Sequence, residues 1–425
     1  MIKILQVRNI DSFVESRRQK TSEKDRKTVQ AILNDVRKNG DFAVKKYERK
    51  FNGRKTSQLR VSAKEIKEAK SKISREENFA LYQMETKIGF QSGALMNDLG
   101  NLTKKMPRQG SPGLCDLTRS FIPIPSVGCY VPGGQARYPS SAIMSVVPAR
   151  IAGVKRIVCV TPPSNNLNPY IAFLLDELGI NEVYQVGGAQ AIAALTFGTN
   201  TIKPVNKIFG PGNAYVAAAK KQVFGKVGID LVAGPSEIIV VADETSNAEW
   251  VASDLMAQAE HDENAQSILI TNSNKFADQV LEKINNLLNV VSKKDIINLS
   301  LKKNGLIIVM DDLLLSYKVI NKIGPEHLHL QSKQNEDILK NIKNAGGIFL
   351  GNYSAEAFGD YIVGTNHVLP TSGASKFSSG LGVLDFMKKS SLVHINESSF
   401  NNLSEHVKNI ADVENLDAHK LSVTI

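Results

Sequence analysis

Short runs of aliphatic and β-branched residues alternate with helical stretches from about residue 121 onward, and this alternation most constrains the fold. In the first series, the strand-like runs "RIVCV" and "EVYQVGG" are separated by "NPYIAFLLDELGI". The rhythm begins again after residue 236, with "EIIVVAD", "SILIT" and "GLIIVMD". Strands connected through helices at this pace form βαβ units, whose parallel sheets are covered by helices on both faces. The two series therefore predict an α/β protein with two parallel sheets.

The segments that flank these series are polar and helical in pattern. Within residues 25–53, Val29, Ile32 and Val36 recur at helical spacing, with breaks at Gly40 and Gly53. We therefore expect residues 1–25 to form a helical extension and residues 381–425 a small helical appendage. Residues 26–129 together with 237–380 would form a first, discontinuous α/β domain, and residues 130–236 a second.

Composition narrows the class of protein. The chain has 425 residues, of which 42% are hydrophobic and 22% charged, as in ordinary globular proteins. No apolar run reaches the ~20 residues that span a bilayer, and the first residues lack the pattern of a signal peptide, so we expect a cytoplasmic protein. The net charge of the chain is +10, but its basic residues are scattered along the sequence and interleaved with acidic ones. This pattern argues against a nucleic-acid partner. Cys115, Cys129 and Cys159 lie far apart in apolar contexts, which indicates buried side chains and neither disulfides nor a thiolate metal site.

Glycine-rich segments follow several predicted strands. They are "YVPGGQARYPSS" (130–141), "VGGAQAIAA" (186–194), "FGPGNAY" (209–215) and "AGPSE" (233–237). In open parallel sheets, ligands bind at strand ends where backbone N–H groups and helix N-termini are free. Each segment alone is also explained by a tight turn, but four within 110 residues favour a ligand site. No G-x-G-x-x-G is present, so the sequence predicts two Rossmann-like domains without the usual dinucleotide fingerprint.

The segment "DLMAQAEHDEN" (254–264) ends an apolar helical stripe in two polar side chains. Val251 and Leu255 are four residues apart, and the stripe continues to Gln258 and then His261. Buried polar groups without partners cost roughly 1–3 kcal/mol each. Either these two are core residues with ordinary hydrogen bonds, or a ligand supplies their partner.

Other polar residues would complete a nitrogen and oxygen donor set. They are Asp360 in "FGDYIVGTNHVLPTSG" (358–373) and Glu414 and His419 in "ENLDAHK" (414–420). Such donors suit Zn²⁺ or Mn²⁺. In "KIGPEHLHL" (322–330), Glu326 lies next to His327, and a carboxylate with an imidazole suits proton transfer. Because adjacent side chains diverge on a helix or strand, the two would act at neighbouring positions and would not pass one proton between them.

These segments resemble the histidinol dehydrogenase family. The resemblance runs from about residue 26 to the C-terminus and is carried by eight segments in order: "GGAQAIAA", "FGPGNAYV", "AGPSE", "DLMAQAEHD", "GPEHL", "NAGGIFLG", "GTNHVLPT" and "LDAHK". The family oxidises L-histidinol through the aldehyde to L-histidine, the end of histidine biosynthesis, with two NAD⁺ and one zinc ion per site. It is a homodimer with shared active sites, which makes the C-terminal appendage an expected dimer contact.

The resemblance also implies roles for individual residues. Zinc would be held by Gln258, His261, Asp360 and, from the other subunit, His419. Glu326 and His327 would be the acid–base pair, and Tyr130, Gln190 and Asn213 would bind NAD. The substrate would contact Ser236, Gln258, His261, His327, Asp360, Glu414 and His419. The family usually has an acidic residue where this chain has His329. A zinc-dependent hydrolase is the alternative that the same residues leave open.

Overall fold

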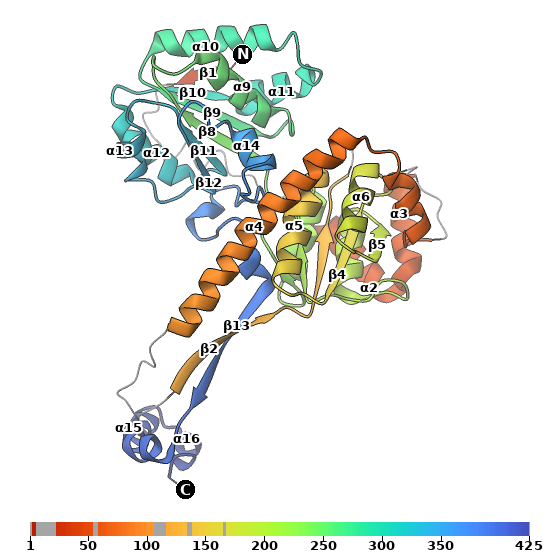
Figure 1. The fold of residues 1–425 in the computed structure, drawn as a ribbon, viewed down its shortest axis with the longest axis vertical. Coiled ribbons are helices and arrows are strands. Elements are labelled where there is room, and N and C mark those ends of the chain that lie inside the picture. The colour runs from red at the N-terminus through yellow and green to blue at the C-terminus, as the bar shows by residue number, and fades with distance from the viewer. Residues whose placement is uncertain are drawn as a thin grey trace.

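The computed structural model describes residues 2–5, 23–53, 58–105, 116–133, 138–164 and 167–424. Two parallel sheets, each flanked by helices, form its two lobes, and an antiparallel pair of strands extends away from both (Figure 1). The predicted α/β class with two parallel sheets is therefore confirmed. Among the described residues, no helix combines the length and apolarity needed to span a membrane.

The first sheet has six strands in the order β1-β10-β9-β8-β11-β12, and every neighbouring pair is parallel. Its strands are β1 (Lys3–Leu5), β8 (Glu237–Val241), β9 (Gln266–Thr271), β10 (Leu306–Val309), β11 (His327–Leu330) and β12 (Gly347–Leu350). Its helices are α9 (Ala248–Ala259), α10 (Asn274–Leu287), α11 (Lys294–Asn304), α12 (Ser316–Ile323), α13 (Asn335–Leu339) and α14 (Glu356–Tyr361), with a 3-10 turn at Leu313–Leu315.

Side chains alternate across this sheet and bury both faces. Ile238 and Val240 pack with residues of α9, α10 and α11, whereas Ile239 and Val241 pack with residues of α12 and α13. All five residues of β8 are buried, as expected for a central parallel strand. The helices thus fix the strand ends from both sides.

The second sheet has five parallel strands in the order β5-β4-β3-β6-β7. Its strands are β3 (Ser126–Tyr130), β4 (Arg156–Thr161), β5 (Glu182–Gln185), β6 (Lys207–Phe209) and β7 (Gly228–Ile229). Its helices are α5 (Pro139–Ile151), α6 (Pro169–Glu177), α7 (Gly188–Phe197) and α8 (Ala214–Val223). If β1 is set aside, both sheets have the same order, third–second–first–fourth–fifth in chain sequence. This is the doubly wound order of Rossmann-like folds.

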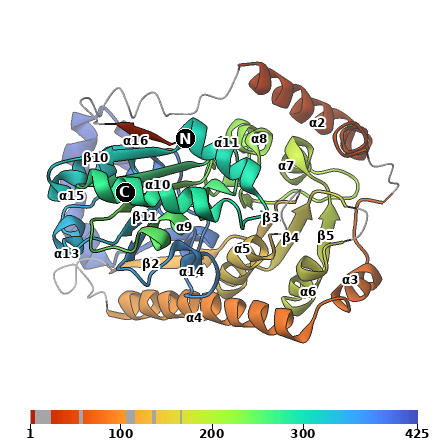
Figure 2. The same cartoon turned by 90° about the horizontal axis from the view of Figure 1, so that it is seen from above.

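Three N-terminal helices, α2 (Glu23–Asn52), α3 (Ala63–Lys70) and α4 (Arg75–Lys105), contact the helices of the five-stranded sheet. Figure 2 shows α4 along one side of the molecule and α2 near the opposite side. Gly40, with φ of 51°, kinks α2, and the helix ends just before Gly53, as the sequence predicts. These contacts place helices α2, α3 and α4 beside the five-stranded sheet. The sequence predicts that residues 26–129 belong with the six-stranded sheet, and the division into domains stays a prediction.

Both terminal segments contain a strand where helix is expected. Lys3–Leu5 forms β1 at the edge of the six-stranded sheet, parallel to β10, and residues 6–22 lie outside the described part. Within residues 381–425, Met387–His394 forms β13, because it pairs along its whole length with β2 (Asp116–Pro123). Helices α15 (Glu397–Val413) and α16 (Asp417–Leu421) follow it, and 3-10 turns cover Ala374–Lys376 and Val383–Phe386.

Gly210 fixes the loop after β6 against β3. Its φ is 105°, and a Cβ there would lie 2.1 Å from the carbonyl oxygen of Tyr130. We expect Gly210→Ala to lower the free energy of unfolding by about 3 kcal/mol, because both backbone strain and a backbone clash oppose it. Gly225 has a similar φ of 95° and nothing within 4 Å, so Gly225→Ala should cost only about 1–2 kcal/mol. Urea unfolding of both variants measures the difference, and equal losses would contradict the close approach.

Candidate functional site

The predicted chemistry gathers at the amino end of the six-stranded sheet. Glu237 and His327 begin the adjacent strands β8 and β11, and Glu326 immediately precedes β11. Helix α9 ends at Ala259, which places Gln258 and then His261 at the same edge, and α14 contacts α9 (Figure 2). The site therefore lies opposite the carboxyl end at which open parallel sheets usually bind ligands.

His327 is held with one ring nitrogen free to accept a proton. Its Nδ1 lies 3.2 Å from the carbonyl oxygen of Glu237, to which an Nδ1–H donates. Its Nε2 lies 3.4 Å from Oε1 of Glu356 and 3.9 Å from Oδ1 of Asp360. Burial disfavours the imidazolium and lowers the pKa of His327 to about 3. The ring is neutral near pH 7, as a general base must be before it acts.

Glu326 is its immediate neighbour. Its Oε2 accepts a hydrogen bond of 2.9 Å from the backbone N–H of Glu237 and lies 3.8 Å from Nδ1 of His327. Burial, reinforced by the nearby carboxyls of Glu237 and Asp360, raises its pKa well above the usual value. The backbone of one residue, Glu237, thus positions both predicted acid–base groups.

Two more carboxyl groups come from α14. Glu356 and Asp360 are four residues apart and both buried, so they share one face of the helix. Burial raises the pKa of Glu356 to about 9, with the nearby Asp360 adding to the effect, and burial raises the pKa of Asp360 to about 6. The metal-free pair therefore retains a proton at neutral pH.

Gln258 and His261 approach this cluster from α9. Gln258 is 1% exposed, and its Oε1 has no hydrogen-bond partner among the described residues. His261, two residues after α9, is exposed, yet the surrounding protein partly desolvates its ring and lowers its pKa. Nδ1 of His367 lies 3.9 Å from Oδ1 of Asp360. Burial, with a smaller contribution from the charge of His261, lowers the pKa of His367 to about 4.

This donor set fits a divalent cation. One ligand atom each from His327, Glu356 and Asp360 lies within 4.8 Å of the other two, and Oε1 of Glu356, like that of Gln258, is buried without a hydrogen-bond partner among the described residues. A cation would also be favoured at the C-terminal end of α9, where helix carbonyls converge. Imidazole, carboxylate and carboxamide donors suit a borderline metal such as zinc.

The two predicted site residues near the C-terminus, Glu414 and His419, lie far from the six-stranded sheet of their own chain. Glu414 directly follows α15 and His419 lies in α16, and both are exposed. Figure 1 shows these helices at the far end of the β2–β13 arm, away from both sheets. A single chain therefore does not bring His419 to Gln258, His261 and Asp360.

The predicted NAD residues lie at the carboxyl edge of the five-stranded sheet. The hydroxyl of Tyr130 accepts a 3.1 Å hydrogen bond from the backbone N–H of Gly188, and burial raises its pKa to about 12. Gln190 is buried two residues later, and its Nε2 donates to Oε1 of Glu48 over 2.8 Å. Asn213 is exposed and caps α8. Ser236 lies in the short linker from this sheet to β8, next to the site.

Three residues of these clusters have no role predicted from the sequence. His367 lies in "FGDYIVGTNHVLPTSG" (358–373), where Asp360 is the predicted ligand. Glu356 could have been predicted from the sequence, because a carboxylate four residues before Asp360 lies on the same face of a helix. Glu48 accepts from both Gly187 N–H and Gln190 across about 140 residues of sequence, which no local pattern indicates. Cys129 and Cys159 are buried as predicted, and Cys115 lies outside the described residues.

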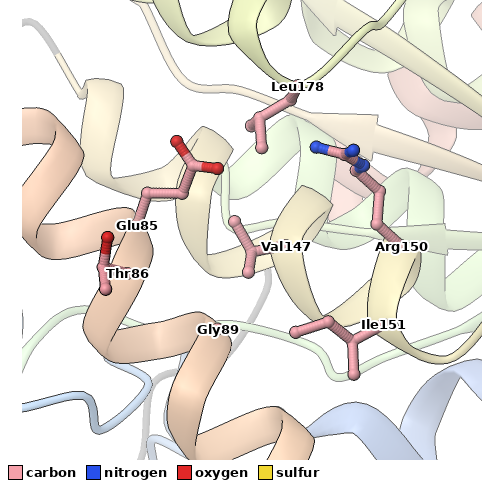
Figure 3. A pocket seen from close by; sticks show the side chains of 7 residues that line it. All are labelled: Glu85, Thr86, Gly89, Val147, Arg150, Ile151 and Leu178. Carbon is pink, nitrogen blue, oxygen red and sulfur yellow. The ribbon is translucent and has the colours of Figure 1, made fainter.

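A surface pocket of about 340 Å³ lies between α4 and α5 (Figure 3). Glu85 and Arg150 face it from opposite helices, with Val147, Ile151 and Leu178 as its apolar lining. None of the predicted site residues lines it, so it is separate from the candidate site.

Comparison with known proteins identifies the family. The family model described as histidinol dehydrogenase matches residues 15–425. A histidinol dehydrogenase of Clostridium acetobutylicum is 44% identical over 94% of this chain and 91% of its own length. One of Listeria monocytogenes is also 44% identical, over 93% of this chain and 92% of its own. The crystal structure of histidinol dehydrogenase from Elizabethkingia anophelis superposes with a TM-score of 0.92 at 34% identity, covering 100% of this chain and 97% of that one.

The chain belongs to the histidinol dehydrogenase family. The resemblance given by the eight segments is thereby confirmed, and with it the class of oxidoreductase. The individual residue roles inferred from the family remain predictions for this chain.

The raised pKa of Glu356 makes the stability of the metal-free protein depend on pH. A carboxyl whose folded pKa is raised contributes stability that is complete below its unfolded pKa of about 4.5 and is lost as pH rises through about 9. Glu356→Gln cannot ionise, so its free energy of unfolding should fall less between pH 5 and pH 9 than that of the wild type. Urea unfolding in chelator measures this, with the exposed Glu336→Gln as control. Equal slopes for wild type and Glu356→Gln would contradict the assignment.

Proposed function

We propose that this protein oxidises L-histidinol through L-histidinal to L-histidine with two NAD⁺. The observation that carries the proposal is the buried cluster of neutral imidazole, carboxyl and carboxamide groups at the amino end of the six-stranded sheet. Membership of the histidinol dehydrogenase family supplies the substrate. The reaction needs a proton acceptor, a water activator and a hold on the intermediate aldehyde, and the cluster offers a group for each.

Gln258, His261 and Asp360 would hold zinc, together with His419 of a second copy. The unpartnered oxygen of Gln258 and the lowered pKa of His261, which leaves a ring lone pair free, support this set. When bound, zinc would hold and orient the imidazole and amino nitrogens of the substrate. Glu356 and His327, whose ligand atoms lie beside that of Asp360, would line the same space.

His327 would accept the proton of the alcohol as the first hydride passes to NAD⁺. Its free Nε2 and its Nδ1–H bond to Glu237 support this role, because the tautomer is fixed by the backbone. Glu326 would take a proton from water as the water oxygen bonds to the aldehyde carbon, and the hydrate would then give the second hydride to a second NAD⁺. Burial raises its pKa and so makes its carboxylate a stronger base, which supports this role.

The nicotinamide would reach the site from the glycine-rich edge of the other sheet. Tyr130, Gln190 and Asn213 lie at that edge, and β7 and β8 are separated only by residues 230–236. Seven residues span at most about 25 Å, so the two edges are held near each other. A dinucleotide bound along this edge would extend toward Ser236 and the acid–base pair.

A homodimer would complete the site. The β2 and β13 strands of the arm pair only with each other among the described strands, and such a two-stranded unit is marginal in water. The arm and its helices expose large apolar side chains, including Leu392, Val393, Ile410, Val413 and Leu421. A second copy would cover this surface and could receive Glu414 and His419 in its own site.

Separate assays of the two half-reactions test the proposal. The wild type should form two NADH per histidine from histidinol, which a hydrolase would not. Glu326→Gln should retain oxidation of histidinol to histidinal but lose about 10²–10⁴-fold in kcat/KM with histidinal, because only the second step needs activated water. His327→Asn, as control, should impair both steps. Equal loss of both half-reactions in Glu326→Gln would contradict its role, and no NADH from the wild type would contradict the function.

A further inference from the structure

His329 connects the three segments that carry the candidate metal ligands. It lies in β11 two residues after His327, and its side chain is completely buried. One partner, Asp254, is on α9 four residues before Gln258. The other, Gly351, follows β12 and lies five residues before Glu356.

Both ring nitrogens of His329 have hydrogen-bond partners on other segments. Its Nδ1 lies 2.6 Å from Oδ2 of Asp254, and its Nε2 lies 2.8 Å from the carbonyl oxygen of Gly351. Each ring nitrogen is therefore bonded to a different segment, one to a side-chain carboxyl group and one to a backbone carbonyl, which fixes the orientation of the ring. The amide nitrogen of Gln331 lies 3.0 Å from Nδ1 and donates to Asp254 Oδ2 over 3.2 Å, which adds a second donor to this carboxylate.

The hydrogen bonds of His329 fix how far α9 and α14, which carry the candidate ligands, lie from β11. One hydrogen bond holds α9, with Gln258 and His261 at its end, against β11. The other holds the turn that leads into α14, with Glu356 and Asp360, against the same strand. Because both bonds come from one rigid ring, neither segment can shift without breaking a buried hydrogen bond.

We propose that the buried His329–Asp254 pair is a positioning device that preforms the cation site between α9 and α14. The inference rests on the proposed function, since it takes these residues to be the ligands. His329 and Asp254 touch none of the candidate ligand atoms in the contacts of the described residues, so their effect on the metal would be indirect. Residues that orient metal ligands in this way typically change metal affinity 10–100-fold when they are substituted.

Titration of the metal-free full-length protein with Co²⁺ tests the proposal, because the visible spectrum of Co²⁺ reports both affinity and coordination geometry. We expect His329→Leu and Asp254→Asn each to weaken Co²⁺ binding at least tenfold and to alter the spectrum. His329→Gln keeps one donor and should lie between them and the wild type. The double variant His329→Leu/Asp254→Leu should lose less than the sum of the losses of His329→Leu and Asp254→Leu measured separately, because it removes both partners and leaves neither buried polar group unpaired by the change.

The matched control is Lys220→Met, which breaks the buried Lys220–Asp230 ion pair beside the five-stranded sheet. It should lower the unfolding temperature while leaving Co²⁺ affinity and spectrum as in the wild type. If folded His329→Gln and Asp254→Asn bind Co²⁺ within about twofold of the wild type with an unchanged spectrum, the positioning role is wrong while the proposed function stands. If the wild type binds no Co²⁺ and forms no NADH from histidinol, both are wrong.

Discussion

Burial of three carboxyl groups at one end of a parallel sheet is the constraint on which the rest of this structure depends. Glu326, Glu356 and Asp360 are each less than a tenth exposed, and the ion pairs of the described residues bring no lysine or arginine to them. In the metal-free protein, protonation and neutral histidines reduce the cost of this burial. A bound cation would neutralise the carboxylates in place of those protons and would release them. Metal binding, proton release and stability are therefore linked in this site.

The two sheets share one strand order but present opposite edges to the proposed reaction. The five-stranded sheet offers its carboxyl edge, where Tyr130 ends β3, Gln190 lies in the first turn of α7 and Asn213 caps α8. The six-stranded sheet offers its amino edge, where the starts of β8 and β11 and the end of α9 supply the polar groups. The short linker at residues 230–236 joins these two edges. In the proposed reaction, a hydride acceptor held by one sheet would meet a substrate held by the other, and the arm of a second copy would close the site.

Local patterns predicted the two sheets, because strand alternation, helix periodicity and glycine-rich turns are properties of neighbouring residues. The roles of the site residues follow only from the resemblance to the family and stay predictions. The polar end of the α9 stripe identified Gln258 and His261 as unusual for a buried helical face. Strand β11 was not predicted, since "HLHL" puts two histidines where a buried strand normally has aliphatic residues. The contacts of Glu48 with Gln190 and of His329 with Asp254 join residues far apart in sequence, and only tertiary packing shows them.

The most direct test of the account is the anomalous scattering of zinc in crystals of the full-length protein grown with the metal and recorded at the zinc absorption edge. We predict one peak per site, between Gln258 Oε1, the imidazole of His261 and the carboxylate of Asp360, with His419 of a second copy as the fourth ligand. A peak elsewhere, or a peak at this cluster with His419 remote from it in every assembly of the molecule, would contradict the account.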